Sequence, residues 1–318
     1  MTNNDITKKI AIIGTGFVGM SFAYALICNS ICDELVLIDI NKKKAIGEAM
    51  DLNHGLSFAK TNTKIYAGEY YDCKDADIVV ICAGAAQKDG ESRISLLNRN
   101  VTVFKSIIDP ILSSGFNGIF IVATNPVDIM TKITAQISGF DPKRVIGTGT
   151  TLDTARLRYL IGNYFNVDPK NIHAYVIGEH GDSELVPWSQ ALVATKHIKS
   201  IIEKNPDKYK FDDLAKIEKD VVGAAQKIIE AKKATYYGIG MALVRIVKAI
   251  FGNEKSVLTV SSMLLGEYSI NEVYVGNPCI IDQNGIRENI VLDLEKDELL
   301  KFKKSCNMLK EITNDIII

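Results

Sequence analysis

The sequence predicts an α/β protein with a doubly wound parallel sheet in its N-terminal half and a smaller α+β region after it. The first half contains five short runs rich in Val and Ile, each bounded by turn residues. Helix-length segments lie between several of these runs, and the resulting βαβ rhythm is typical of a parallel sheet. Near residue 150 the pattern changes to long helical segments and to strands joined by tight turns.

Each of the five N-terminal runs is expected to form one strand. They are continuously apolar rather than alternating, which is typical of strands that are buried on both faces of a sheet. The runs cover residues 9–14, 34–40, 76–84, 118–126 and 144–150.

The C-terminal half is expected to combine helices with tightly connected strands. A helix is predicted to begin near Thr151, with Thr151 as its N-cap, and a strand is predicted over 171–178. Long helical patterns cover 212–251, and a last helix starts near Glu295. The remaining strand-like segments are VLTVSSML, EVYVGNPCIID and ENIVLDL, with Asn284-Gly285 as a hairpin turn signal.

The length of 318 residues allows two medium-sized domains, each with its own core. We place the boundary near residue 150, which gives domains 1–149 and 150–318. Because no long linker or low-complexity segment separates them, we expect the two domains to pack tightly.

Composition excludes several classes of function. The formal net charge is −1 and the basic residues are spread along the chain, so no nucleic-acid surface is expected. The six cysteines lack any CxxC pair or histidine-rich spacing, which predicts no metal site and favours free thiols in a reducing compartment. An apolar run after Lys8-Lys9 is similar to a signal peptide, but glycines interrupt it. We therefore expect a cytoplasmic protein without a membrane span.

The glycines of GTGFVG, Gly14 to Gly19, follow an apolar run and precede a helical pattern. In this context G-x-G-x-x-G indicates a Rossmann dinucleotide-binding fold, in which the glycines let the backbone approach a pyrophosphate at a helix N-terminus. Asp39 ends the next strand, twenty residues after Gly19. A carboxylate there accepts hydrogen bonds from the ribose and repels the extra phosphate of NADP, so the expected cofactor is NAD.

Asp153 and Arg156 are predicted to lie on the apolar face of the helix that starts near Thr151, together with Leu157. An exposed ion pair would lie on the polar face instead. A pair on the buried face is costly unless each group has further partners. Arg158 points to the opposite side and is expected to serve another site.

His180 stands between two glycines in VIGEHGDSEL. Considered alone, it is more simply explained as a surface-loop histidine. Near Asp153 its imidazole would be held in one tautomer with a raised pKa, and Arg156 would offer two donors to a carboxylate. With a nicotinamide, these groups suit the exchange of a hydride and a proton at a carbon beside a carboxylate.

Several motifs together give the chain a specific resemblance. It resembles the lactate branch of the lactate/malate dehydrogenase family over nearly its whole length. The motifs, in the family's order and spacing, are GTGFVGMSFAYAL, AGAAQKDGESR, VATNPVDI, LDTARLR, GEHGDSELVPWSQ and KKATYYGIGMALVRI.

The resemblance implies roles for individual residues in pyruvate reduction to L-lactate. His180 would be the proton donor and acceptor, oriented by Asp153, and Arg156 would clamp the substrate carboxylate. Arg93 would close over the site and polarise the carbonyl, with Asn125 and Thr235 also lining the substrate pocket. Besides Gly14, Gly16, Gly19 and Asp39, the implied cofactor contacts are Val18, Lys44, Tyr70, Gly84, Ala85, Ser106, Ala123, Thr124, Asn125, Thr148 and Ile239.

Gln87 favours pyruvate over oxaloacetate. The malate branch usually carries an arginine at this position, and a neutral Gln87 would leave a second substrate carboxylate unpaired. Asp89 and Ser92 depart from the family's usual proline and threonine on this loop, and the loss of the proline is expected to make the open loop more flexible. A malate or broader 2-hydroxy-acid dehydrogenase is the alternative enzyme, and a non-catalytic NAD-binding sensor is the alternative outside enzymes.

Arg158 and His173 match positions that bind fructose 1,6-bisphosphate in allosteric bacterial members of the family. The resemblance therefore implies activation by this sugar bisphosphate and assembly as a homotetramer. Two surface cations are the simpler alternative.

Overall fold

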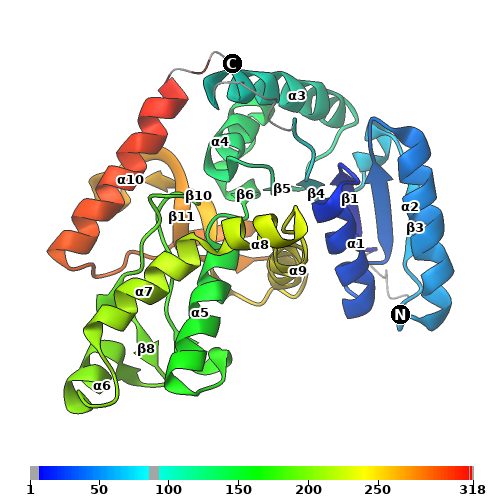
Figure 1. The fold of residues 1–318 in the computed structure, drawn as a ribbon. Coiled ribbons are helices and arrows are strands. Elements are labelled where there is room, and N and C mark those ends of the chain that lie inside the picture. Colours follow the sequence, from blue (N-terminus) through cyan, green and yellow to red (C-terminus); the bar gives the residue numbers. More distant parts are fainter. Residues whose placement is uncertain (1–6, 86–92, 315, 317–318) are drawn as a thin grey trace, which may run out of the picture.

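The computed structural model describes residues 7–85, 93–314 and 316, with the backbone alone at residues 93 and 94. Its N-terminal half alternates strands and helices (Figure 1). The elements are β1 (Lys9–Ile13), α1 (Phe17–Asn29), β2 (Glu34–Ile38), α2 (Lys42–Gly55), β3 (Lys64–Ala67), β4 (Ile78–Ile81), α3 (Arg93–Ser113), β5 (Ile119–Val122), α4 (Val127–Ser138) and β6 (Val145–Gly147).

The remaining chain adds helices and antiparallel strands. These elements are α5 (Thr151–Phe165), β7 (Ile172–His173), β8 (Leu192–Val193), β9 (Lys196–His197), α6 (Ile198–Lys204), α7 (Phe211–Val222), α8 (Ala224–Lys232), α9 (Tyr237–Phe251), β10 (Ser256–Leu265), β11 (Asn271–Asp282), β12 (Gly285–Asn289) and α10 (Lys296–Asn314).

The main sheet has the order β12-β11-β10-β6-β5-β4-β1-β2-β3, and the six strands from β6 to β3 are parallel. This confirms the predicted doubly wound sheet. Strand β10 extends it through one antiparallel pair, Ser261 with Gly147, so both halves of the chain share one sheet. The order reverses between β1 and β4, and such a switch point opens a crevice at the carboxyl ends of the strands.

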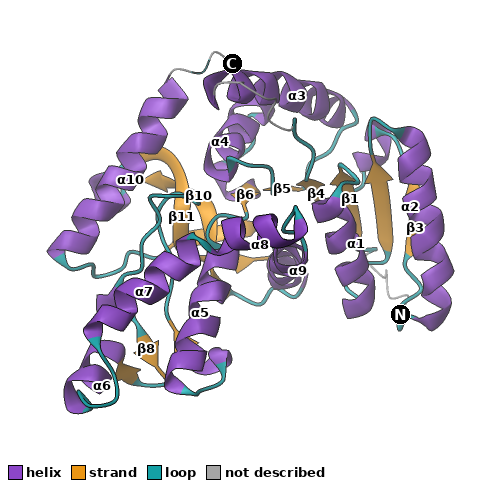
Figure 2. Ribbon diagram, in the orientation of Figure 1, coloured by secondary structure: helices purple, strands orange, loops and turns teal. Residues whose placement is uncertain are grey.

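Alternate residues of the parallel strands face two separate cores. On β1, Ala11 and Ile13 pack with residues of α3, α4 and α10. Ile10 and Ile12 pack with residues of α1 and α9 on the other face. All four of these side chains are at most 2% exposed, because helices cover both faces of the sheet (Figure 2). Two-sided burial explains why the strands read as continuous apolar runs.

Strand β3 and the start of α5 differ from the expectation. Strand β3 was not predicted, because only Ile65 of its four residues is buried and it lies at the edge of the sheet. The helix α5 begins after Thr150, so Thr151 is its first residue and not the N-cap. The Thr150 hydroxyl donates to the Val176 carbonyl and that of Thr151 to the Thr259 carbonyl. Both hydroxyls thus serve tertiary contacts.

Three C-terminal features also differ. The segment predicted as a strand over 171–178 forms a regular strand only at β7, and Ile177 and Gly178 make isolated β-bridges. The last strand is β12, which includes only the first two residues of ENIVLDL. The hairpin turn consists of Gln283 and Asn284, and Gly285, with φ +103°, is already paired with Asp282. The last helix, α10, starts close to the expected residue.

Candidate active site

The glycine loop between β1 and α1 is shaped for close backbone approach. Gly14 has φ +99°, and a Cβ there would lie 2.7 Å from the Ala83 nitrogen. A Cβ on Gly19 would lie 2.1 Å from the Gly14 carbonyl oxygen. Around Gly16, the N-cap of α1, a Cβ would meet no atom within 4 Å. Two of the glycines therefore let the chain pack on itself, and Gly16 leaves open space at a helix N-terminus, where a phosphate binds favourably.

Asp39 is tied to the same loop. One oxygen of its carboxylate accepts hydrogen bonds from the Thr15 amide at 2.8 Å and the Thr15 hydroxyl at 2.9 Å. The other accepts from the Asn41 amide at 2.9 Å. Burial by itself would raise the pKa of Asp39, but these hydrogen bonds and the nearby Lys44 outweigh it and lower the pKa. Asp39 therefore stays ionised at neutral pH.

A cavity of about 420 Å³ lies beside this loop. It brings together eight residues predicted for the cofactor, namely Gly14, Gly16, Asp39, Lys44, Tyr70, Gly84, Ala85 and Ser106. Val18, Gly19, Ala123, Thr124, Thr148 and Ile239 are not among its lining residues. Its apolar wall was not predicted and includes Val103 and Ile107 of α3 and the fully exposed Ile40. An isoleucine in solvent directly after Asp39 is the signal that could have indicated an apolar ligand surface.

A second cavity, of about 510 Å³, is lined by the expected catalytic groups. Asn125, Asp153, Arg156 and His180 all line it. The carboxylate of Asp153 lies between the other two charged groups, with His180 Nδ1 at 2.6 Å from Oδ2 and Arg156 Nη1 at 2.8 Å from Oδ1. Asp153 is 1% exposed. The predicted pair of Asp153 and Arg156 is thus present, and His180 is the further partner of the Asp153 carboxylate.

The geometry sets the protonation of this pair. Burial alone would lower the pKa of His180, but the hydrogen bond and charge of Asp153, with the charge of Asp128 nearby, raise it to about 9. Burial would also raise the pKa of Asp153, but the hydrogen bond from His180 and the charges of His180 and Arg156 lower it. At neutral pH the cavity therefore holds an imidazolium beside a carboxylate, and the imidazolium is a ready proton donor.

Asp128, at the start of α4, holds the histidine loop and was not predicted as a site residue. Its Oδ2 accepts the His180 backbone N–H at 2.8 Å, and its Oδ1 accepts the Ser261 hydroxyl at 2.5 Å. It is 2% exposed, and burial raises its pKa to about 6 despite these two hydrogen bonds. The signal in the sequence was an acid within the otherwise apolar VDIM of a helix start. The second residue that was missed is Glu184, which lines the same cavity.

Other expected substrate residues are not placed in this cavity. Thr235 is not among its lining residues. Gln87 lies outside the described residues, as do Asp89 and Ser92 of the same loop. Arg93 begins α3, and its side chain is likewise outside what the structure describes.

Arg158 lines a separate cavity of about 430 Å³ on the other side of α5. Its Nε donates to the Ala174 carbonyl at 3.1 Å, and its guanidinium lies over the Tyr175 ring. Lys170 and Arg245 line the same cavity, whereas the exposed His173 does not.

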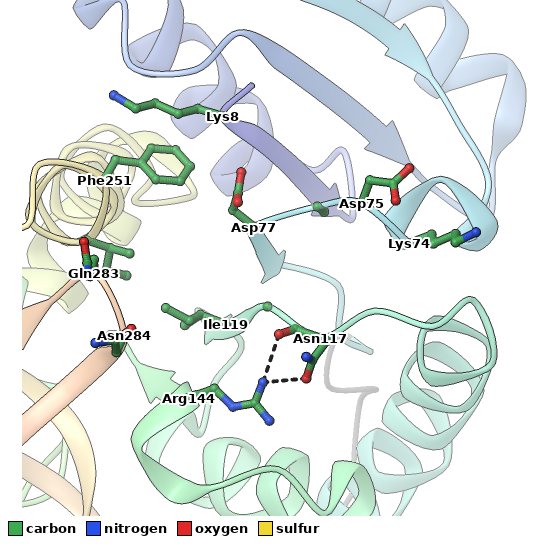
Figure 3. Close-up of a pocket in the computed structure, with 13 residues that line it drawn as sticks. Lys8, Lys74, Asp75, Asp77, Asn117, Ile119, Arg144, Phe251, Gln283 and Asn284 are labelled. Carbon is green, nitrogen blue, oxygen red and sulfur yellow. Dashed lines mark hydrogen bonds between the residues drawn. The ribbon is translucent and has the colours of Figure 1, made fainter. Parts of the chain in front are cut away.

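A larger cavity, of about 770 Å³, lies at the amino ends of the parallel strands (Figure 3). Several of its polar groups already serve the fold. Arg144 donates to the carbonyl and side-chain oxygens of Asn117 at 2.9 and 2.8 Å, and Asp77 accepts the Lys9 amide. Ligands of open parallel sheets bind at the opposite, carboxyl edge, where the glycine loop and Asn125 lie. We therefore place the functional site there.

Two family models match almost the entire chain. One is described as lactate/malate dehydrogenase, NAD binding domain, and matches residues 8–147. The other is described as lactate/malate dehydrogenase, alpha/beta C-terminal domain, and matches residues 150–317.

Curated relatives and solved structures agree with these models. An L-lactate dehydrogenase of Geobacillus sp. is 54% identical over 305 residues, which are 96% of this chain and 95% of the relative. L-lactate dehydrogenase 1 of Peribacillus psychrosaccharolyticus is also 54% identical and covers 96% of each chain. The structure resembles a lactate dehydrogenase from a Medee basin deep-sea metagenome library, with TM-score 0.95, 50% identity and coverage of 97% and 98%.

A minor L-lactate dehydrogenase from Enterococcus mundtii, in a ligands-bound form, has TM-score 0.96 and 46% identity, with 99% of this chain and 100% of that chain covered. On this evidence the chain belongs to the lactate/malate dehydrogenase family, whose N-terminal region binds NAD.

Proposed function

We propose that the chain is an NAD-dependent L-lactate dehydrogenase that catalyses the reversible reduction of pyruvate. The observation that carries the proposal is the placement of His180, Asp153 and Arg156 in one cavity, in a chain about half identical to L-lactate dehydrogenases over nearly its full length. The glycine loop and Asp39 fit NAD, because they combine an open helix N-terminus with an ionised carboxylate for a ribose.

Each cavity residue has a chemical task in this proposal. Arg156 uses one nitrogen on Asp153 and has further N–H groups for the carboxylate of pyruvate. His180 uses Nδ1 on Asp153, so its Nε2–H gives the proton to the carbonyl oxygen. NADH, when bound, supplies the hydride to the carbonyl carbon. Asn125 orients the substrate from the loop after β5, and the family resemblance assigns to Arg93 the polarisation of the carbonyl.

The preference for pyruvate is tested by following NADH absorbance with pyruvate and with oxaloacetate. We expect pyruvate to be strongly preferred, since Gln87 offers no charge to a second carboxylate. A preference for oxaloacetate would identify the chain as a malate dehydrogenase instead. In His180→Ala, we expect kcat to fall by at least about 10²-fold, the usual range for an oriented general acid. Unchanged turnover in that variant would remove His180 from the mechanism.

We further propose activation by fructose 1,6-bisphosphate at Arg158 and His173 in a cytoplasmic homotetramer. In support, Arg158 shares its cavity with Lys170 and Arg245, and such a concentration of cations suits an anionic sugar phosphate. The exposed apolar side chains of Met50 and Phe58 are candidates for burial between subunits. Among the described residues, no helix has the length and apolar character to cross a bilayer.

The test measures the pyruvate KM and the molecular mass by light scattering, with and without the bisphosphate. We expect the effector to lower KM in the wild type and to have no effect in Arg158→Gln. If neither KM nor mass responds in the wild type, the regulatory site is wrong. We also propose that the NAD-binding and catalytic domains cover 1–149 and 150–318, in line with the ranges of the two family models.

A further inference from the structure

Glu184 is a buried acid inside the catalytic cavity that the mechanism above does not use. It lies four residues after His180, where its backbone N–H closes a turn by donating to the Gly181 carbonyl. The residue is 8% exposed and lines the same cavity as Asp153, Arg156 and His180. One oxygen of Glu184, one of Asp153 and a ring nitrogen of His180 all lie within 4.8 Å of one another.

The Glu184 carboxyl has no hydrogen-bond partner within the described part of the chain. The acids around it are already engaged. Asp153 is shared by His180 and Arg156, and Glu179 accepts the Ser183 hydroxyl. The acids and bases that face Glu184 or its neighbours are Asp153 and Arg156 of α5, His180, Glu179 and Asp182 of its own loop, Asp128 of α4, and Glu218 of α7.

An ionised Glu184 would disturb the charge balance of this cavity. With Glu184 uncharged, Arg156, protonated His180 and Asp153 leave one surplus positive charge, which matches one substrate carboxylate. Asp128 does not line the cavity, and the carboxylate of Asp182 is exposed to solvent. Ionisation of Glu184 would cancel that surplus. It would also place an acceptor beside His180 that competes with the carbonyl oxygen for the proton. Burial and the charge of Asp153 both act against this ionisation and raise the pKa of Glu184 to about 9, although His180 and Arg156 oppose them.

We propose that Glu184 is a positioning and selectivity residue that must carry a proton when substrate binds. As the uncharged acid, it preserves the surplus positive charge for a single carboxylate and leaves the His180 proton available to the carbonyl. The cavity is thereby matched to monoanionic 2-oxo acids, and their binding requires two protonated groups, His180 and Glu184. This inference rests on the proposed pyruvate reductase activity and adds a second proton to its substrate-binding step.

The test is the pH dependence of kcat/KM for pyruvate at saturating NADH, between pH 6.5 and 10.5. In the wild type, the logarithm of kcat/KM should fall with a slope that steepens toward −2, because two protons are required. Glu184→Gln keeps the shape and cannot ionise, so its slope should stop at −1. Glu218→Gln is the matched control, since Glu218 accepts hydrogen bonds from Val186 and Trp188 outside the cavity. It should keep the wild-type slope.

A second readout does not depend on turnover. Calorimetric titration of the enzyme–NADH complex with oxamate, an isostere of pyruvate, in buffers of different ionisation enthalpy counts the protons taken up. At pH 9 we expect more proton uptake in the wild type than in Glu184→Gln. If Glu184→Gln does not fold, Glu184→Met, similar in volume and never charged, takes its place in both measurements.

The outcomes separate the two proposals. A change of slope from −2 to −1, with reduced proton uptake, supports the role of Glu184. Equal slopes and equal proton uptake in the wild type and Glu184→Gln would overturn it, while pyruvate reduction by the wild type would leave the proposed function standing. If the wild type does not reduce pyruvate at all, the proposed function fails, and the role of Glu184 fails with it.

Discussion

The hydrogen-bonded pair of His180 and Asp153 makes one prediction that can be worked out in magnitude. The substitution Asp153→Asn keeps the shape of the side chain and removes its charge. The wild-type histidine has its pKa raised from 6.5 to about 9, and each unit corresponds to about 1.4 kcal/mol. The environment therefore favours the imidazolium by about 3 kcal/mol, and Asp153 supplies the main favourable contribution.

Without that charge, burial is the largest remaining influence on His180, and burial lowers the pKa. We expect the pKa to fall to 6.5 or below in Asp153→Asn. At pH 7.5 the protonated fraction would then fall from about 97% to about 9%, from the standard titration relation. Protonation alone predicts a tenfold loss of kcat/KM for pyruvate. The loss of the carboxylate partner of Arg156 should add to this, because it leaves a partly buried cation unpaired.

The assay is pyruvate reduction followed by NADH absorbance from pH 5 to pH 10. The wild type should keep its activity up to about pH 9, whereas Asp153→Asn should recover activity only below about pH 6.5. Asp213→Asn is the matched control, since Asp213 accepts from Lys216 and from the Tyr164 hydroxyl outside the catalytic cavity, and it should leave the profile unchanged. If Asp153→Asn keeps the wild-type pH midpoint, the raised pKa of His180 does not come from Asp153 and the reasoning is wrong.

Three further predictions follow from other contacts. Asp128→Ala removes the acceptor of the His180 backbone N–H. We expect kcat to fall at least tenfold and the Kd for NADH to stay within about twofold. A large loss of NADH binding would contradict this positioning role. Gly19→Ala forces a Cβ to 2.1 Å from the Gly14 oxygen. We expect the free energy of unfolding, measured by thermal unfolding, to fall by at least about 1–3 kcal/mol. An unchanged Tm would refute the close approach. Asp39→Ala should weaken NADH binding in a fluorescence titration and reduce the preference for NADH over NADPH. An unchanged preference would show that another group binds the ribose.

Stability should also depend on the proton held by Glu184. Its folded-state pKa of about 9 lies above its ordinary value of 4.5, so its contribution is fully present below pH 4.5 and is lost as the pH rises through 9. Between these limits the wild type should lose up to about 1.4 kcal/mol of unfolding free energy per pH unit relative to Glu184→Gln. Urea unfolding at pH 6, 7 and 8 measures this difference. A constant difference across the three pH values would show that the acid is ionised in the folded state.

The sequence alone determined the parallel sheet, the glycine loop and the acid that follows β2. These features depend on local requirements. A strand buried on both faces must be apolar throughout, and a backbone angle of φ +99° at Gly14 favours glycine because other residues rarely adopt it. The helical spacing of Asp153 and Arg156 also placed a charged pair on a buried face before any contact was known. Positions that depend on one segment of chain can be recognised in this way.

The tertiary structure decided the contacts between segments that are distant in the sequence. Asp128 accepts a hydrogen bond from the backbone N–H of His180, which is 52 residues away in the sequence. In the sequence pattern of α4, Asp128 is recognisable only as a residue on a buried helix face. The N-cap of α5 is Thr150 rather than Thr151, and the Thr150 hydroxyl donates to the Val176 carbonyl instead of capping the helix. Glu184 reads as one more polar residue of a loop until burial places it against Asp153 and His180. The protonation of a carboxyl depends on the charges and solvent around it, and only the folded chain defines them.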